Sequence, residues 1–133
     1  MTNATPNAFL IDATTAGPIA HPLTLDALQA TVGGYIEAAF TVPSPTRKGY
    51  AITGYVNDEG LLIELPVSVI TSATGPLAGP LIVCGLNLKD GETAALTAEE
   101  IEYLTERTRL LAAAGTLGGT VQAVHALDLR ERR

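Results

Sequence analysis

The sequence predicts an α+β fold: a single domain with a mostly antiparallel sheet, on which one short and one longer helix pack. The chain of 133 residues is 47% hydrophobic and 17% charged, which is enough apolar material for one core. Several stretches alternate with a period of two, and two others repeat apolar residues at helical spacing. Because hairpin-length links outnumber helical crossovers, most strand pairs are expected to be antiparallel. The domain is expected to span 1–133, with 1–7 and 130–133 as loose tails.

The chain is expected to begin with a hairpin that precedes the short helix. Ala8–Asp12 is a short apolar run that fits a strand, and Thr14–Pro18 is rich in turn residues. Ile19–Leu23 then fits a second strand, whose end is fixed by Pro22. These two strands are predicted to pair with each other.

The short helix is expected to begin after Thr24, whose hydroxyl can accept a hydrogen bond from the first turn. Leu25, Leu28 and Val32 recur at helical spacing and form a narrow apolar stripe. Gly33 and Gly34 follow at once and are interpreted as a structural turn, because glycine adopts positive φ without strain and so ends helices.

Three further strands are predicted between the glycines and the middle of the chain. Residues 35–42 alternate, and so do Tyr50–Val56; the loop Pro43–Gly49 separates them. Asn57–Gly60 is interpreted as a turn in which the asparagine and Gly60 take left-handed conformations. Leu61–Leu65 is expected to be the strand that follows this turn.

The order of several motifs resembles that of the small phage- and mobile-element-associated proteins called domain of unknown function 3846. The motifs are Leu28-Gln29, Val32-Gly-Gly-Tyr-Ile-Glu37, Tyr55-Val-Asn-Asp-Glu-Gly60, Leu65-Pro66, and Gly79-Pro-Leu-Ile-Val83 followed by Gly85. The chain departs from the family at Pro66–Ile70, which is apolar and β-branched where members often carry a more polar segment. The resemblance implies a fold and a host context, and it transfers no activity.

The second half of the chain is expected to add a buried strand and the longer helix. Val67–Thr71 fits a strand by propensity, although the family resemblance leaves a helix open there. Gly75–Pro80 reads as a loop, and Leu81–Cys84 as a strand buried on both faces. Val121–Leu129 alternates like a strand.

Thr97-Ala-Glu-Glu100 matches a capping box, which is typical of a helix start. The helix is predicted to run to Gly115 or to the Gly118-Gly119 pair, because glycines commonly end helices. Its inner side would carry Ile101, Leu104, Thr108, Leu111 and Ala112.

The composition disfavours several function classes. The formal net charge of −6 makes nucleic acid an unlikely partner, because phosphate binding needs clustered cations. His21 and His125 have no neighbouring Cys or acid at ligand spacing, so no metal and no cofactor is expected. Cys84 cannot form an internal disulfide and is expected to be a buried thiol in a reducing compartment. No signal peptide or membrane span is recognised, so the expected location is the cytoplasm.

The candidate ligand-binding residues are Tyr35, Glu37, Tyr55 and Asn57. Alternation places Tyr35 and Glu37 on one face of a strand, and an antiparallel neighbour can bring Tyr55 beside them. The alternative is an ordinary exposed sheet face, which is polar because water covers it. No catalytic residue is assigned.

Two readings of function therefore remain open, and a third is weaker. The first is a non-catalytic binding or protein-interaction module of mobile-element type, which pairs with itself or with a host protein. A mean hydropathy of +0.27 in so small a chain favours self-association into a homo-oligomer. The second is a small-molecule-binding protein or small enzyme with a polar site on the sheet. The third is an acidic inhibitor of a host nuclease, suggested by the acidic helix from Glu99 to Glu106.

Overall fold

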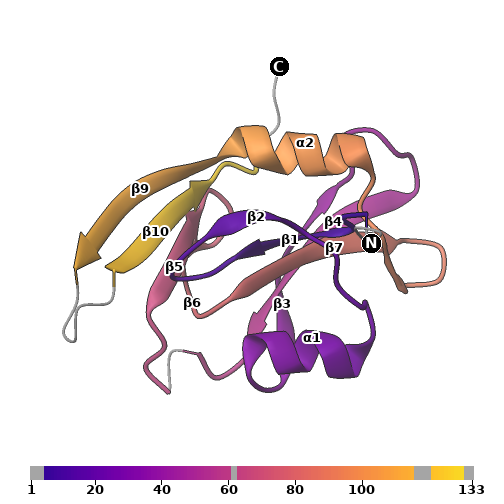
Figure 1. Cartoon of the computed structure of the whole chain (residues 1–133). Helices are drawn as coiled ribbons and strands as arrows, with labels where there is room; N and C mark the ends of the chain where they lie inside the picture. The colour runs from indigo at the N-terminus through magenta and orange to yellow at the C-terminus, as the bar shows by residue number, and fades with distance from the viewer. Residues whose placement is uncertain (1–4, 61–62, 116–120, 131–133) are drawn as a thin grey trace.

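The computed structural model describes residues 5–60, 63–115 and 121–130, and these residues form two sheets and two helices (Figure 1). The six-stranded sheet has the order β2-β1-β7-β4-β3, with β8 paired to β7. Its strands are β1 (Ala8–Ile11), β2 (Ala16–Ile19), β3 (Ile36–Pro43), β4 (Tyr50–Asn57), β7 (Leu81–Asn87) and β8 (Thr93–Ala94). All of its strand pairs are antiparallel.

The four-stranded sheet has the order β6-β5-β10-β9. Its strands are β5 (Val67–Thr71), β6 (Gly75–Ala78), β9 (Thr108–Gly115) and β10 (Val121–Leu127), and the helices are α1 (Leu25–Val32) and α2 (Ala98–Arg107). β5 and β10 are parallel, and the other pairs are antiparallel. The predicted α+β class with a mostly antiparallel sheet is confirmed, although the strands divide into two sheets.

The main core lies between the two sheets and under α2. It gathers Phe9 and Leu81 from the six-stranded sheet, Val69 and Leu127 from the four-stranded sheet, and Leu104 from α2. All five of these side chains are at most 1% exposed. In Figure 1, α2 and α1 lie on opposite sides of the molecule, with the sheets between them.

A smaller core joins α1 to the other face of the six-stranded sheet. Leu28 and Val32 of the helix pack with Ala8 and Ile82. Leu25, which was expected in the same stripe, is 57% exposed. The Thr24 hydroxyl accepts from the Ala27 amide, 3.3 Å away, so the helix begins where its cap was expected. It ends at Gly33, whose φ of 85° is the left-handed conformation that glycine tolerates best.

β7 occupies the middle of the six-stranded sheet, and its first five residues are buried. This confirms that Leu81–Cys84 is a buried strand. The Cys84 side chain is 0% exposed, and burial raises the pKa of its thiol to about 12.

Cys84 is therefore expected to resist thiol reagents while the protein is folded. A disulfide reagent such as DTNB at neutral pH should label native protein at least about a hundredfold more slowly than urea-unfolded protein, because the thiolate is the reacting species. The absorbance of the released thiolate measures both rates. Complete labelling of native protein within minutes, with an unchanged circular dichroism spectrum, would contradict this burial.

The turn of the first hairpin is shorter than predicted, and the second strand begins earlier. β2 is Ala16–Ile19 and not Ile19–Leu23. The carboxylate of Asp12 accepts hydrogen bonds from the Thr14 and Thr15 amides at 2.8 and 2.9 Å, which closes the turn directly after β1. The returning strand therefore begins three residues earlier than the pattern suggested.

Two further predictions in the middle of the chain are wrong. Residues 63–64 form a turn, and Leu65 is not part of a strand; Glu64 has a φ of 58°. Residues 61–62 lie outside the described residues. The expected loop at Gly75–Pro80 contains β6, which pairs with β5 despite Pro76 because β6 is an edge strand. The open question at Val67–Thr71 is resolved as strand.

The longer helix is also shorter than predicted. The capping box at Thr97 and Glu100 is formed, but α2 ends at Arg107, and Thr108 already has an extended backbone. Thr108, Leu111 and Ala112 were expected on the inner side of the helix and instead belong to β9. Pairing of β9 with β10 along its whole length outweighs the local helical pattern.

Candidate functional site

The four candidate residues do not form the single patch that alternation predicted. In the β3–β4 ladder Glu37 lies opposite Val56, whereas Tyr55 lies opposite Ala38. Residues directly opposite each other share a face of the sheet, so Glu37 and Tyr55 point to opposite faces. Tyr35 precedes β3 and is 72% exposed. The expected convergence of these side chains is therefore wrong, and ligand binding by any of them stays a prediction.

Asn57 has a structural contact on the α1 side of the sheet. Its amide nitrogen donates to the Val32 carbonyl at 3.2 Å, and its side-chain oxygen accepts from the Glu59 amide at 2.8 Å. A Cβ on Gly34 would lie 3.0 Å from this amide nitrogen. The φ of Gly34 is not positive, so this position does not need glycine for its backbone conformation. It needs glycine because a side chain would prevent the close approach of Asn57. Asn57 thus ties the end of α1 to the turn after β4.

Tyr55 lines a cavity of about 470 Å³ on the same face of the sheet. Burial raises the pKa of its hydroxyl, and the nearby Cys84 thiol adds to the rise. The cavity lies between α1 and the sheet and is lined by Leu23, Leu25, Leu28, Ile36, Tyr55, Glu92 and Thr93.

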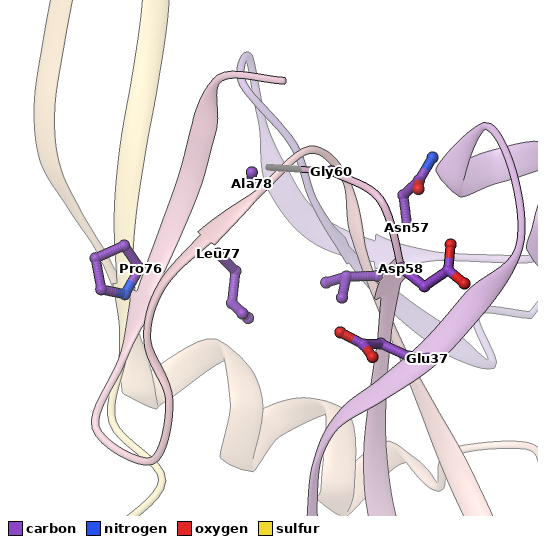
Figure 2. A pocket seen from close by; sticks show the side chains of 8 residues that line it. Glu37, Asn57, Asp58, Gly60, Pro76, Leu77 and Ala78 are labelled. Carbon is purple, nitrogen blue, oxygen red and sulfur yellow. The ribbon is translucent and has the colours of Figure 1, made fainter. Parts of the chain in front are cut away.

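Glu37 lines a different cavity, of about 300 Å³, on the opposite face of the sheet (Figure 2). This cavity, called the Glu37 pocket below, lies between the β3–β4 pair and β6. Its lining comprises Glu37, Val56, Asn57, Asp58, Gly60, Pro76, Leu77 and Ala78. Figure 2 shows the carboxylate of Glu37 turned toward Leu77, whereas the side chains of Asn57 and Asp58 turn away from β6.

Gly60 shapes the Glu37 pocket through close backbone packing. A Cβ at this position would lie 3.0 Å from the Ala78 carbonyl oxygen. The expectation that Asn57 and Gly60 take left-handed conformations is wrong, because neither residue has a positive φ. The missing side chain of Gly60 instead lets the turn after β4 approach β6, which brings the two sheets together beside the pocket.

Glu100 of α2 forms a buried network that sequence reasoning missed. Arg47 donates to both carboxylate oxygens, at 2.8 and 3.3 Å, and the Ser44 hydroxyl donates to one of them. The Thr97 amide also donates to this carboxylate, at 2.9 Å. The Arg47 guanidinium stacks 3.9 Å above the ring of Tyr50. The capping-box match predicted the contact with Thr97, but no local signal points to a residue 53 positions away.

The pKa of the Glu100 carboxyl reflects two opposing effects. Burial raises it, and the side chain is 0% exposed. The hydrogen bonds from Ser44, Thr97 and Arg47, with the charge of Arg47, outweigh burial and hold the pKa below its usual value. The carboxylate is therefore charged at neutral pH and fully hydrogen-bonded by its neighbours. The role of the network is structural: it holds α2 against the loop between β3 and β4.

The two histidines have separate surroundings. One ring nitrogen of His21 lies 2.6 Å from the Pro22 carbonyl oxygen, and the other 2.5 Å from the Thr31 hydroxyl. Nδ1 of His125 is buried and has no hydrogen-bond partner among the described residues. Within residues 5–60, 63–115 and 121–130, no three His, Cys, Asp or Glu side chains are grouped closely enough to hold a metal ion. Neither described helix is long and apolar enough to cross a bilayer.

The fold and the two cavities define a small α+β protein in which two sheets meet beside a surface pocket. Comparison with families of known sequence places the chain more narrowly. Residues 6–109 match the family described as Domain of unknown function (DUF3846), and the chain belongs to that family. No curated protein and no solved structure matches the chain. The matched residues end within β9, so β10 lies beyond them.

Proposed function

We propose that the chain is a non-catalytic protein-interaction module that associates with a second copy of itself along β9. β9 is an edge of the four-stranded sheet, so one side of the strand has no neighbour among the described residues. An edge strand presents backbone N–H and C=O groups that a further strand can pair with. The open edge of β9 is the observation that supports this function.

The other edge strands carry features that discourage pairing. β2 and β6 have four residues each and contain Pro18 and Pro76. β3 has a register shift between Ala38 and Phe40, and it ends in Pro43. β9 has eight residues, no proline and Arg109 as its single charged residue. Proline, bulges and short length are the usual means of protecting an edge, and β9 lacks the first and the last.

Exposed leucines lie beside the open edge of β9. Leu110 is 54% exposed and Leu111 is 41% exposed. A register shift in the pairing with β10 falls between Leu110 and Ala112, so Leu111 has no direct partner on that strand. On the outer face, Arg109 aligns through Ala126 with Ile70, which is 39% exposed. Two antiparallel copies of β9 would bring their Leu110 and Leu111 side chains together around a twofold axis.

Sedimentation velocity at increasing micromolar concentration tests this proposal. The wild-type chain is expected to be a dimer, and the double variant Leu110→Lys, Leu111→Lys is expected to raise the dimer dissociation constant at least about tenfold, because each added charge must be desolvated at the interface. Leu88→Lys is the matched control, since Leu88 is 56% exposed and lies in the turn after β7.

Two outcomes would overturn the proposal. One is a wild-type chain that remains monomeric at high micromolar concentration. The other is a double variant that dimerises as tightly as Leu88→Lys while its circular dichroism spectrum is unchanged. A host protein as partner and a mobile-element setting are further parts of the proposal, taken from the resemblance of the sequence motifs; the description of the matched family assigns neither.

A further inference from the structure

The Glu37 side chain is exposed, and its carboxylate faces a mostly apolar cavity that has no counter-charge among the described residues. The ion pairs among the described residues join Arg47 to Glu100 and Arg130 to Asp128, and Glu37 takes part in neither. None of the eight lining residues carries a positive charge. The contrast with Glu100 is informative, because that carboxylate is saturated by donors from three residues. Glu37 is therefore free to accept hydrogen bonds from a ligand.

The walls of the Glu37 pocket are complementary to a hydrocarbon stem. Val56 lines the pocket from β4, and Pro76, Leu77 and Ala78 line it from β6. In Figure 2, the side chain of Leu77 lies on the Glu37 side of β6. The volume of about 300 Å³ is at the lower end of the range of small-ligand sites. A short alkyl chain can pack against these side chains while its polar end remains beside the carboxylate.

The arrangement favours an organic cation over a metal ion. Divalent cations such as Ca²⁺ need six or more oxygen ligands, and Mg²⁺ needs six at short, regular distances. Only the carboxylate of Glu37 is turned toward β6, whereas Asp58 is turned away (Figure 2). One carboxylate is sufficient for an ammonium or guanidinium group, which donates charge-assisted hydrogen bonds.

We propose that the Glu37 pocket binds a single alkylammonium or guanidinium group, with Glu37 accepting its hydrogen bonds and Val56 and Leu77 packing against its stem. The group can belong to a free amine or to a lysine or arginine side chain of another protein. The pocket involves β6, which is the opposite edge of the four-stranded sheet from β9. Binding there is therefore separable from association along β9.

The test is a titration of the ¹⁵N-labelled protein, followed through amide chemical shifts. The probes are butylammonium, agmatine and N-acetyl-lysine methylamide, with 1-butanol as the uncharged analogue. All three cations are expected to give saturable shifts in the amides of residues 56–58 and 77–78. The uncharged 1-butanol is expected to give no saturable shift. The tightest of the cations indicates whether a free amine or a protein side chain is the better ligand.

Glu37→Gln is expected to weaken cation binding at least about tenfold, because it removes the charge and keeps the shape. Glu59→Gln is the matched control: it removes the same charge from the neighbouring turn, and Glu59 does not line the pocket. The affinity of this variant should stay within about twofold of the wild type, because a carboxylate outside the pocket cannot accept hydrogen bonds from the bound cation. Both variants should keep the wild-type melting temperature.

Three results would overturn the inference. The first is the absence of saturable shifts with every cation. The second is equal binding of 1-butanol and butylammonium, which would reduce the site to an apolar hollow. The third is an equal loss of affinity in Glu37→Gln and Glu59→Gln, which would show attraction to the overall negative charge. None of these results depends on whether the chain dimerises.

Discussion

Replacing Glu100 with alanine is expected to lower the free energy of unfolding by about 3 kcal/mol, because it leaves the partner of a buried ion pair without its counter-charge. The carboxylate of Glu100 is fully buried, and Arg47 is 25% exposed. Without Glu100, Arg47 must reach water or keep only its contacts with the Ala95 carbonyl, 3.2 Å away, and with the ring of Tyr50. The reciprocal contact of the capping box with Thr97 is lost as well.

Urea denaturation at pH 7 measures this effect, with Glu99→Ala as the control. Glu99 lies in the same first turn of α2 but is exposed, so its replacement should change the free energy of unfolding by less than about 0.5 kcal/mol. Equal stability losses in the two variants would mean that the buried network adds nothing beyond a charge near the helix start.

The same network predicts how stability depends on pH. The pKa of Glu100 in the folded protein is lower than its usual value of about 4.5. A carboxyl with a depressed pKa contributes stability that is present above its unfolded pKa and is lost as the pH falls through the folded pKa. Acidification from pH 6 to pH 3 should therefore destabilise the wild type more than Glu100→Gln.

Replacing Gly54 with alanine is expected to cost about 3 kcal/mol of stability through overpacking of the main core. A Cβ at Gly54 would lie 2.4 Å from a ring carbon of Phe40 and 2.9 Å from a methyl carbon of Leu81. Phe40 and Leu81 are 7% and 0% exposed, so neither can move freely into solvent. The phenyl ring covers the glycine across the β3–β4 ladder, where the two residues lie directly opposite each other.

Thermal and urea unfolding of Gly54→Ala measure the loss, and Gly17→Ala is the control. Gly17 also lies in a strand, but a Cβ there would have no heavy atom within 4 Å, so its replacement should be close to neutral. Combining Gly54→Ala with Phe40→Leu should cost less than the sum of the two single changes, because the smaller side chain makes room. Strict additivity would show that the ring is not the obstacle.

The sequence predicted best those elements whose determinants are local. α1 has its cap, its apolar stripe and its terminal glycine within ten residues, and β7 is a short apolar run between turn residues. β9 could not be predicted in this way, since the helical spacing of α2 continues through Thr108 and Leu111. What makes it a strand is pairing with β10, which follows later in the chain.

The prediction of the candidate site failed because the register between β3 and β4 could not be read from the sequence. Alternation showed correctly that Glu37 and Ile36 point to opposite faces, but it could not show which residue of β4 lies opposite each of them. A shift of one residue exchanges the faces, and the ladder places Val56 rather than Tyr55 beside Glu37. β6, which forms the far wall of the Glu37 pocket, was expected to be a loop. The ion pair of Glu100 with Arg47 equally depends on tertiary packing.

The central position of β10 in the four-stranded sheet sets the order in which the protein can fold during synthesis. β5 pairs in parallel with β10 through Val69 and His125, whereas every strand of the six-stranded sheet precedes residue 95. At about 5–20 residues per second, a ribosome needs roughly 3–11 seconds to extend the chain from Thr71 to Leu127. During that interval the six-stranded sheet can form and pack against α1. β5 meanwhile keeps one unpaired edge, and Val69 lacks its neighbours on β10. A nascent chain stalled before β10 should therefore be the species that chaperones hold.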